Sequence, residues 1–562
     1  MLAIAFTAWQ ASRARSALVA VEQHLTSMNA AVSRADTTAA QKELGLGAAA
    51  ARSAYRNTRG PVWWVGSHLP VLGDDIAAVR TVAVVSRDLT ASTLPQLVKA
   101  GSTLSGTLLK PSGGKVPLAP IRRIAPSLAE GGEELEAQAN QVSDIETGGL
   151  LPQIRGPVSG LKEKLVRAST VVTESAAVTR LLPDMLGERA PRTYFLVFQN
   201  NAEIKSLGGL GGAFAIVEAD DGRIKLTRTS RPAEVGEFGR PVLKPSPGQL
   251  AVLGMKPFTQ SQNALSDPDF PRGARVLAEM WRRSQGQQID GVVAVDPVAL
   301  AYLLRATGPV TVGGRTLTEQ NAVDTLLRDV YLQVPTDQAQ NAFFAELVRQ
   351  LFGRLSTGKF DATQLAQALS RGVEERRVLA FSQIPREQKQ LAATEIGGVL
   401  PTSDERRPEV GVYLNDAGFD KLTYYLNYRT DVTADRCYLG AQRLTVRTVL
   451  SSKVPPGPLT PFVVGPGSEG LPLGDMRITV YAYGPVDGRV DALRVDGKAR
   501  PVNSMTDAGR PVGSVTVDIP RGGKHVIEYT MYSARGQSGR AHLLTTPGAK
   551  TDGVGTIGPS AC

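Results

Sequence analysis

Polar residues come directly after an apolar run in the middle of the chain. Residues 193–198 read TYFLVF, a continuous apolar stretch typical of a strand buried on both faces. Asn200, Asn201, Glu203 and Lys205 follow it. Ligands of open α/β sheets bind where strands end, so this position predicts a ligand site. Amide and carboxylate oxygens suit a hard cation and lysine suits phosphate, while the two asparagines have the alternative role of satisfying loop backbone groups.

A second group of charged residues marks two predicted helix starts. Asp267, Asp269 and Arg272 belong to the run DPDFPR, and Asp296 precedes a proline. We expect these side chains near the same strand end, where Glu203, Asp267 and Asp269 are the candidate ligands for Mg²⁺. The sequence indicates no other cofactor. Asp269 and Asp296 are also expected to cap the helices that follow them, which is the simpler interpretation of both.

Gly208 and Gly209 begin a glycine-rich stretch, GGLGG. Glycine lacks Cβ and tolerates positive φ, so such a stretch lets backbone N–H groups approach an anionic ligand. The stretch matches neither the dinucleotide-binding pattern nor the phosphate-binding loop of nucleotide hydrolases. A tight bend between two strands is the simpler interpretation.

The distribution of histidine and cysteine excludes one class of chemistry. His24, His68, His525 and His542 all lie outside residues 187–400, and so do both cysteines. A Ser-His-Asp or Cys-His nucleophile in this middle region is therefore excluded. The zinc-protease HExxH pattern and the GxSxG nucleophile turn do not occur either. The catalytic residues, if the chain is an enzyme, are unknown from the sequence.

Length and patterning predict a multidomain α+β protein. A chain of 562 residues exceeds what one hydrophobic core accommodates. Residues 13–186 carry apolar stripes at coiled-coil spacing and predict a helical bundle or stalk. Strands and helices alternate in residues 187–400, which predicts an α/β core. Residues 401–408 form a polar linker, and the short strands of residues 409–562, separated by Gly, Pro and Asp turns, predict a β-sandwich.

We interpret residues 1–12 as a truncated membrane-anchor helix. The apolar run at residues 1–8 is too short to cross a bilayer, which needs about 20 residues. Trp9, Arg13 and Arg15 nevertheless follow it as they would at the end of a membrane helix. The alternative is the apolar start of a soluble helix.

The net charge of +10 bears on possible partners. Lys and Arg are spread along the chain without a dense run, so we expect no nucleic-acid binding. Basicity also suits a protein beside anionic lipids or envelope polymers. The pair Trp63-Trp64 is consistent with a patch on the membrane surface, although packing where two helices meet is the simpler interpretation.

The two cysteines, Cys437 and Cys562, are 125 residues apart, and the second is the final residue. We predict a disulfide between them that pins the C-terminus to its domain and persists in an oxidising compartment outside the cytoplasm. The alternative is two unrelated buried thiols. No CxxC or Cys/His metal spacing occurs.

Several blocks of the chain resemble one bacterial family. They are residues 192–203 with Gly208-Gly209, residues 290–297 with 306–310, residues 321–331, and the helical block 60–73. Together they look like the "domain of unknown function 4012" (DUF4012) family. The resemblance implies a membrane-anchored envelope protein of unestablished activity. The positive charge common in the family after the glutamate is Lys205 here, which keeps the charge but lacks the two-pronged geometry of arginine.

A weaker likeness concerns the order strand, Asp296-Pro297, helix, Gly308-Pro309. This order is similar to that in the LytR-CpsA-Psr proteins, which transfer lipid-linked glycopolymers to peptidoglycan using acidic residues for Mg²⁺ and arginines for pyrophosphate. The likeness implies a LytR-CpsA-Psr-like central core. The arginine set of that family has no residue-by-residue counterpart in this chain, which puts catalysis in doubt.

The sequence is consistent with two functions. The first is an envelope protein, tethered to the cytoplasmic membrane, that binds or organises a cell-wall polymer or exopolysaccharide. The alternative is an Mg²⁺-dependent phosphotransferase that moves a polyprenyl-pyrophosphate-linked glycan to the cell wall. The scarcity of assignable catalytic groups favours the first. A buried apolar channel beside Asn200 and Glu203 would favour the second, and a solid core would favour the first.

Overall fold

The structure is a computed structural model that describes residues 2–34, 36–70, 72–105, 110–402, 406–550 and 553–562. It forms two compact units, Met1–Arg189 and Ala190–Cys562. A helical N-terminal region and several β-sheets confirm the predicted multidomain α+β class. Residues 403–405 of the predicted linker, Met1 and the side chains of residues 2–8 in the predicted anchor lie outside the described residues.

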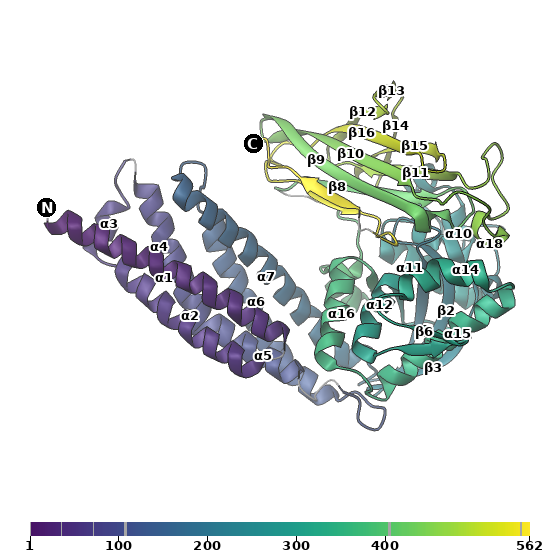
Figure 1. Cartoon of the computed structure of the whole chain (residues 1–562), viewed down its shortest axis with the longest axis horizontal. Helices are drawn as coiled ribbons and strands as arrows, with labels where there is room; N and C mark the ends of the chain where they lie inside the picture. Colours follow the sequence, from purple (N-terminus) through teal and green to yellow (C-terminus); the bar gives the residue numbers. More distant parts are fainter. Residues whose placement is uncertain (1, 35, 71, 106–109, 403–405, 551–552) are drawn as a thin grey trace. The chain divides into compact units, whose positions relative to one another are not determined.

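The first unit is built from long helices that run side by side (Figure 1). Helices α1 and α2 pack against each other, and Met28, Ala31, Ala40 and Leu44 from the two helices share a small core. None of the described helices is long and apolar enough to cross a membrane, and the anchor at residues 1–12 stays a prediction. The helices are α1 (Leu2–Ser33), α2 (Thr37–Thr58), α3 (Pro61–Gly66), α4 (Gly73–Asp88), the π-helical segment η1 (Leu89–Thr93), α5 (Leu94–Ser105), α6 (Leu118–Ser143) and α7 (Pro152–Met185).

A mixed five-stranded sheet forms the centre of the second unit, in the order β3-β2-β1-β4-β7. Its strands β1 and β4 are parallel, and the other neighbours are antiparallel. Strand β1 contains residues 193–198, the apolar run that predicted a buried strand. The five strands are β1 (Arg192–Asn200), β2 (Leu210–Asp220), β3 (Arg223–Ser230), β4 (Gly291–Val295) and β7 (Val378–Ser382).

Helices cover both faces of this sheet. On one face α11 (Phe270–Gln285) buries Trp281 against Phe195 and Phe214 of the sheet. On the other face α12 (Pro297–Thr307) and α15 (Asp337–Ser356) share a core with Phe198. The remaining elements of this part are α8 (Pro232–Val235), α9 (Pro247–Leu253), α10 (Lys256–Thr259), η3 (Ser261–Ser266), β5 (Val310–Val312), β6 (Arg315–Leu317), α13 (Ala322–Asp324), η4 (Thr325–Asp329), α14 (Val330–Gln333), α16 (Ala362–Glu374), α17 (Pro385–Leu391) and η5 (Glu395–Gly397).

Two further sheets occupy the last part of the chain, with the orders β13-β12-β16-β10-β9-β18 and β14-β15-β11-β8-β17. Both sheets contribute to one core, which also takes in Ala202, Ile204 and Tyr331 from the preceding part of the chain. The elements are β8 (Glu409–Asp416), η6 (Leu422–Tyr425), β9 (Leu426–Tyr438), β10 (Ala441–Ser452), α18 (Pro461–Val464), β11 (Met476–Tyr483), β12 (Arg489–Val495), β13 (Lys498–Arg500), β14 (Asn503–Asp507), β15 (Arg510–Ile519), β16 (Lys524–Tyr532), β17 (His542–Thr545) and β18 (Val554–Ile557).

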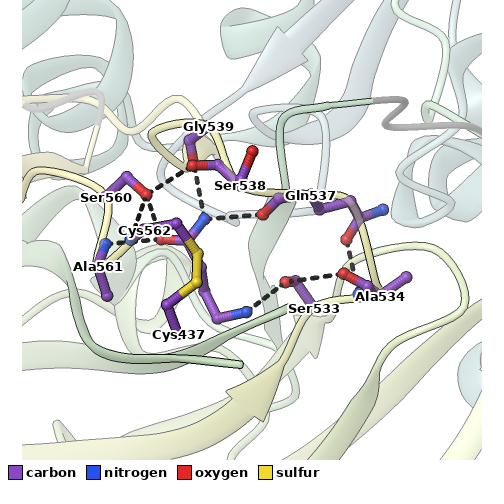
Figure 2. Close-up of a disulfide and its surroundings, with 10 residues drawn as sticks. Cys437, Ser533, Ala534, Gln537, Ser538, Gly539, Ser560, Ala561 and Cys562 are labelled. Carbon is purple, nitrogen blue, oxygen red and sulfur yellow. Dashed lines mark hydrogen bonds between the residues drawn. A yellow bond between two sulfur atoms is a disulfide. The ribbon is translucent and has the colours of Figure 1, made fainter. Parts of the chain in front are cut away.

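The predicted disulfide between Cys437 and Cys562 is confirmed (Figure 2). It joins the end of β9 to the end of the chain. The fully buried side chain of Gln442 holds the same segment, because its Oε1 accepts hydrogen bonds from Ser560 Oγ and Ala561 N, both at 2.9 Å. Its Nε2 donates to the carbonyl of Gly539 at 2.6 Å. A covalent bond and a buried amide therefore both fix the C-terminus.

Replacing both cysteines with serine is expected to lower the free energy of unfolding by about 4 kcal/mol, because the bond closes a long loop in the unfolded chain. Urea denaturation followed by circular dichroism measures the change. Reductant should destabilise the parent and leave the double variant unaffected, since the chain has 2 cysteines in all. Equal denaturation midpoints for parent and variant would contradict this role.

Candidate functional site

A cavity of about 680 Å³ lies between α15 and the sheet, beside the end of β1. A second cavity of about 500 Å³ adjoins it along α15, and Ala213 and Phe344 line both. Gly211, Gly212 and Ala213 of β2 provide one wall, so small side chains leave the space open. The opposite walls are largely apolar and include Leu300, Leu326, Leu327, Leu347 and Val348.

Asn200 and Glu203 both line this cavity. Asn200 Nδ2 donates to Glu203 Oε1 at 2.9 Å and to the hydroxyl of Tyr331 at 3.3 Å. Lys421 forms an ion pair with Glu203, with 2.8 Å between Nζ and Oε1. Burial raises the pKa of Tyr331 well above its usual value, so its hydroxyl keeps its proton. The polar end of the cavity therefore presents an amide, a phenol and a charge-balanced pair.

Asn201 faces a different set of partners, although it is adjacent in sequence. Its Nδ2 donates to Asp296 Oδ2 at 3.1 Å and to the carbonyl of Pro547 at 3.2 Å. Arg377 bonds the same Asp296 oxygen at 2.6 Å and is 3% exposed. Asp296 also caps α12, as the sequence indicates, by accepting from Ala299 N. These contacts connect the end of β1 to the start of α12 and to the segment around Pro547.

Lys205 is buried away from the cavity. Its Nζ donates to the backbone carbonyl of Asp416 at 2.7 Å. Burial lowers the pKa of the Lys205 ammonium, and burial raises the pKa of the Asp416 carboxyl to about 6. The carboxyl of Asp420, close to that of Asp416, has its pKa raised by burial to about 8. Lys205 is thus placed to hold β8 against the end of β1.

Gly208 and Gly209 form a tight bend between β1 and β2. Gly208 has φ of +125° and its N–H donates to the carbonyl of Lys205 at 2.8 Å. A Cβ added at Gly209 would lie 2.4 Å from the carbonyl carbon of Asn200. The positive φ therefore accounts for Gly208, and the close approach to the backbone of Asn200 accounts for Gly209.

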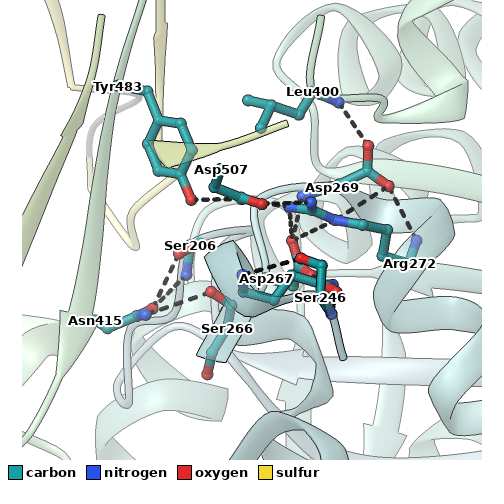
Figure 3. A network of polar contacts seen from close by, with 11 residues as sticks. Ser206, Ser246, Ser266, Asp267, Asp269, Arg272, Leu400, Asn415, Tyr483 and Asp507 are labelled. Atoms are coloured by element: carbon teal, nitrogen blue, oxygen red, sulfur yellow. Dashed lines mark hydrogen bonds and ion pairs between the residues drawn. The ribbon is translucent and has the colours of Figure 1, made fainter. Parts of the chain in front are cut away.

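Asp267, Asp269 and Arg272 form a separate network (Figure 3). Arg272 Nη2 lies 2.6 Å from Asp267 Oδ1 and 2.8 Å from Asp507 Oδ2 on β14. Asp269 caps α11, as expected, and its other oxygen accepts from Leu400 N at 3.1 Å. Burial raises the pKa of Asp267 to about 6, against the opposing effect of Arg272. This network joins the first turn of α11 to the C-terminal sheets.

The three candidate Mg²⁺ ligands are divided between these two places. Glu203 is paired with Lys421, whereas Asp267 and Asp269 are paired with Arg272. Across the described residues, no three His, Cys, Asp or Glu side chains gather as a metal site. Mg²⁺ binding therefore stays a prediction.

Sequence reasoning missed Lys421, Tyr331, Arg377 and Asp507. One signal was available for Lys421: residues 415–421 read NDAGFDK and follow the apolar residues 410–414 of β8, the same pattern that singled out residues 200–205. Arg377 and Asp507 carry no such local signal, because each acts on a residue more than 80 positions away.

Comparison with known proteins bears on this region. Residues 189–331 match the family model described as "Protein of unknown function (DUF4012)". This region belongs to the DUF4012 family. The DUF4012 match includes Asn200, Glu203 and Tyr331, whereas Lys421 lies beyond it. It does not show the likeness to LytR-CpsA-Psr proteins, and no curated protein matches the chain.

Replacing Arg272 with Met is expected to cost about 3 kcal/mol of folding free energy, because it leaves buried carboxylates without a cation. Asp267 already has a raised pKa in the fold, so the native state binds more protons than the unfolded chain above the ordinary pKa of Asp, about 4. Stability from this group is present at low pH and is lost as the pH rises through about 6. The variant should therefore lose more stability at pH 8 than at pH 5, because the missing cation raises this pKa further.

Arg282→Met is the matched control on α11, because Arg282 is an exposed residue paired with Glu279. Urea denaturation at both pH values should show less than about 1 kcal/mol for this control. A pH-independent loss in the Arg272 variant would contradict the account of the network.

Proposed function

We propose that the chain is an extracytoplasmic cell-envelope protein, tethered to the cytoplasmic membrane, that binds a surface glycopolymer in its polyprenyl-linked form. The cavity beside Asn200 and Glu203 is the observation that carries this proposal. Its volume of about 680 Å³ is typical of ligand-binding sites. The leucine, valine and phenylalanine side chains of its lining suit an isoprenoid tail, since burying apolar area contributes about 25 cal/mol per Å².

The polar end of the cavity suits the head of such a ligand. Asn200, Glu203 and Lys421 lie together there, and Gln340 and Asn341 of α15 add amides to the lining. Sugar hydroxyls both donate and accept, so mixed amide and charge-paired groups satisfy them without a net charge. Apolar side chains next to a polar end are the arrangement that a lipid-linked glycan requires.

The location outside the cytoplasm has its own support. The disulfide between Cys437 and Cys562 persists in oxidising compartments and is rare in reducing ones. The basic sequence and the Trp9, Arg13 and Arg15 pattern agree with a position at a membrane. These features support the tether independently of the cavity.

We further infer that the two C-terminal sheets form the predicted sandwich. Side chains of β10, such as Val446 and Leu450, share one core with Ile478 and Val480 of β11 in the other sheet. Sheets that pack face to face bury alternate residues in this way. In this proposal the sandwich supports the cavity by supplying Lys421.

A second candidate function is transfer of the glycan from its lipid carrier, as in the LytR-CpsA-Psr proteins. The cavity next to Glu203 favours it. The cations at the cavity weigh against transfer. Lys421 pairs with Glu203, and Arg231 pairs with Glu234. The positive charges of Lys421 and Arg231 are therefore already balanced and do not serve a pyrophosphate. Binding without transfer is therefore the function we favour.

Native mass spectrometry of the purified chain is expected to detect a bound polyprenyl lipid. Ala213→Trp should reduce lipid occupancy, because the indole would fill the space where the two cavities meet. The matched control is Ala366→Trp on the exposed side of α16, which should retain the lipid. Equal occupancy in both variants, or a parent that takes up no added polyprenyl phosphate, would contradict the proposal.

The Glu203→Ala variant distinguishes binding from transfer. It should keep its fold, since the Glu203–Lys421 pair is partly exposed and such pairs contribute about 1 kcal/mol or less. Its turnover of a polyprenyl-pyrophosphate-linked glycan, with Mg²⁺ present, should equal that of the parent and of the exposed control Glu374→Ala. A parent that turns the substrate over, together with an inactive Glu203 variant, would establish transfer instead.

A further inference from the structure

One end of the first unit exposes an apolar and aromatic surface. Trp64 of α3 is 59% exposed and Val65 is 55% exposed, whereas the neighbouring Trp63 is 6% exposed. The sequence offered packing and membrane contact as two interpretations of this pair, and the structure gives the two tryptophans different positions. Exposed apolar side chains continue through this end of the unit, and we call the set the α3 patch: Val62, Trp64, Val65, Leu69 and Leu72.

Helix α3, which carries Val62, Trp64 and Val65 of the patch, lies beside the start of α1 (Figure 1). Trp63 Nε1 donates to Gln10 Oε1 at 3.2 Å, which places α3 next to the residue that follows Trp9. Trp9 is itself 49% exposed, and the guanidinium of Arg13 lies 4.5 Å from the centre of its ring. The two exposed tryptophans of the unit therefore lie on neighbouring elements at one end.

The loop between α6 and α7 reaches the same end. Leu151 N donates to Asp75 Oδ1 at 2.9 Å, and Asp75 lies in the first turn of α4, directly after the α3 patch. Leu151 is also exposed. Of the twelve exposed large apolar side chains described in residues 9–171, seven belong to this end, namely the five of the α3 patch with Trp9 and Leu151.

Basic side chains accompany these apolar ones. Arg13 and Arg15 of α1 are exposed, as is Arg59 directly before α3. Exposed tryptophans with arginines one or two turns away are typical of protein surfaces at the boundary between lipid headgroups and hydrocarbon. Apolar side chains enter the boundary while arginine meets anionic headgroups, so the charge and the apolar surface of this end complement an anionic membrane.

We propose that the α3 patch, together with Trp9, is a docking surface for an anionic lipid bilayer. It holds the end of the helical unit against the membrane at a point separate from residues 1–8. Membrane contacts on two different elements restrict the tilt of the helices relative to the bilayer. A single flexible anchor does not restrict it. The cavity in the second unit has no part in this proposal, so the two can fail independently.

The test is flotation of the full chain with vesicles of equal parts phosphatidylcholine and phosphatidylglycerol. The combined variant Val62→Ser, Trp64→Ser, Val65→Ser and Leu69→Ser should bind at least about tenfold more weakly than the parent. Leu439→Ser with Leu473→Ser, which alters two equally exposed residues of the second unit, is the matched control and should bind as the parent does. Circular dichroism shows that the helices are retained.

A second variant keeps the test valid if the serine variant does not fold. Arg13→Gln, Arg15→Gln and Arg59→Gln change exposed positions, and this triple variant should lose affinity for the anionic vesicles while losing little for phosphatidylcholine alone. Brominated lipid should quench tryptophan fluorescence in the parent and less so in Trp64→Phe. Unchanged flotation of either combined variant would overturn the proposal. A change in the oligomeric state of the serine variant, measured by ultracentrifugation without vesicles while its flotation is unchanged, would also overturn the proposal. The patch would then be a protein interface.

Discussion

The burial of residues 201–207 is the constraint on which the second unit depends. Once a chain segment is excluded from water, its amides and carbonyls must find partners within the protein. Ile204 supplies one pair: its N–H donates to Thr423 Oγ1 at 2.9 Å and its carbonyl accepts from Asp416 N at 2.8 Å. Ser206 N donates to Asn415 Oδ1 at 2.7 Å. The end of β1 is thereby bonded to β8 and the loop after it, which brings Lys421 to Glu203.

This constraint explains why neighbouring polar residues have different roles. Of the polar residues at the end of β1 and just after it, Asn200 and Glu203 line the cavity, whereas Asn201 and Lys205 bond other parts of the fold together. A buried charge is tolerated when another charge or several hydrogen bonds balance it, and the Arg272 network and the Arg377–Asp296 pair follow this rule. At the cavity itself, the charge of Glu203 is balanced by Lys421.

Local patterns in the sequence predicted several elements of the fold. Residues 193–198 lie in β1 because a continuous apolar run suits a strand covered on both faces. Asp269 and Asp296 cap helices, and each is followed by a proline within the first turn of its helix. The disulfide followed from there being two cysteines. The partners of the buried charged residues could not be predicted from local patterns. Asp507 lies 235 residues after Arg272, and no local pattern in the sequence predicts that the fold brings them together.

The central claim is that the cavity between α15 and β2 accepts the tail of a polyprenyl-linked glycan. The most direct measurement is photo-crosslinking with a polyprenyl diphosphate that carries a diazirine at the end of its tail, followed by mass-spectrometric mapping of the labelled residues. The account predicts labels on the cavity walls, at Ala213, Phe344 and Val348, and their loss when unlabelled lipid competes. Labels confined to the α3 patch, or spread over exposed residues without competition, would contradict it.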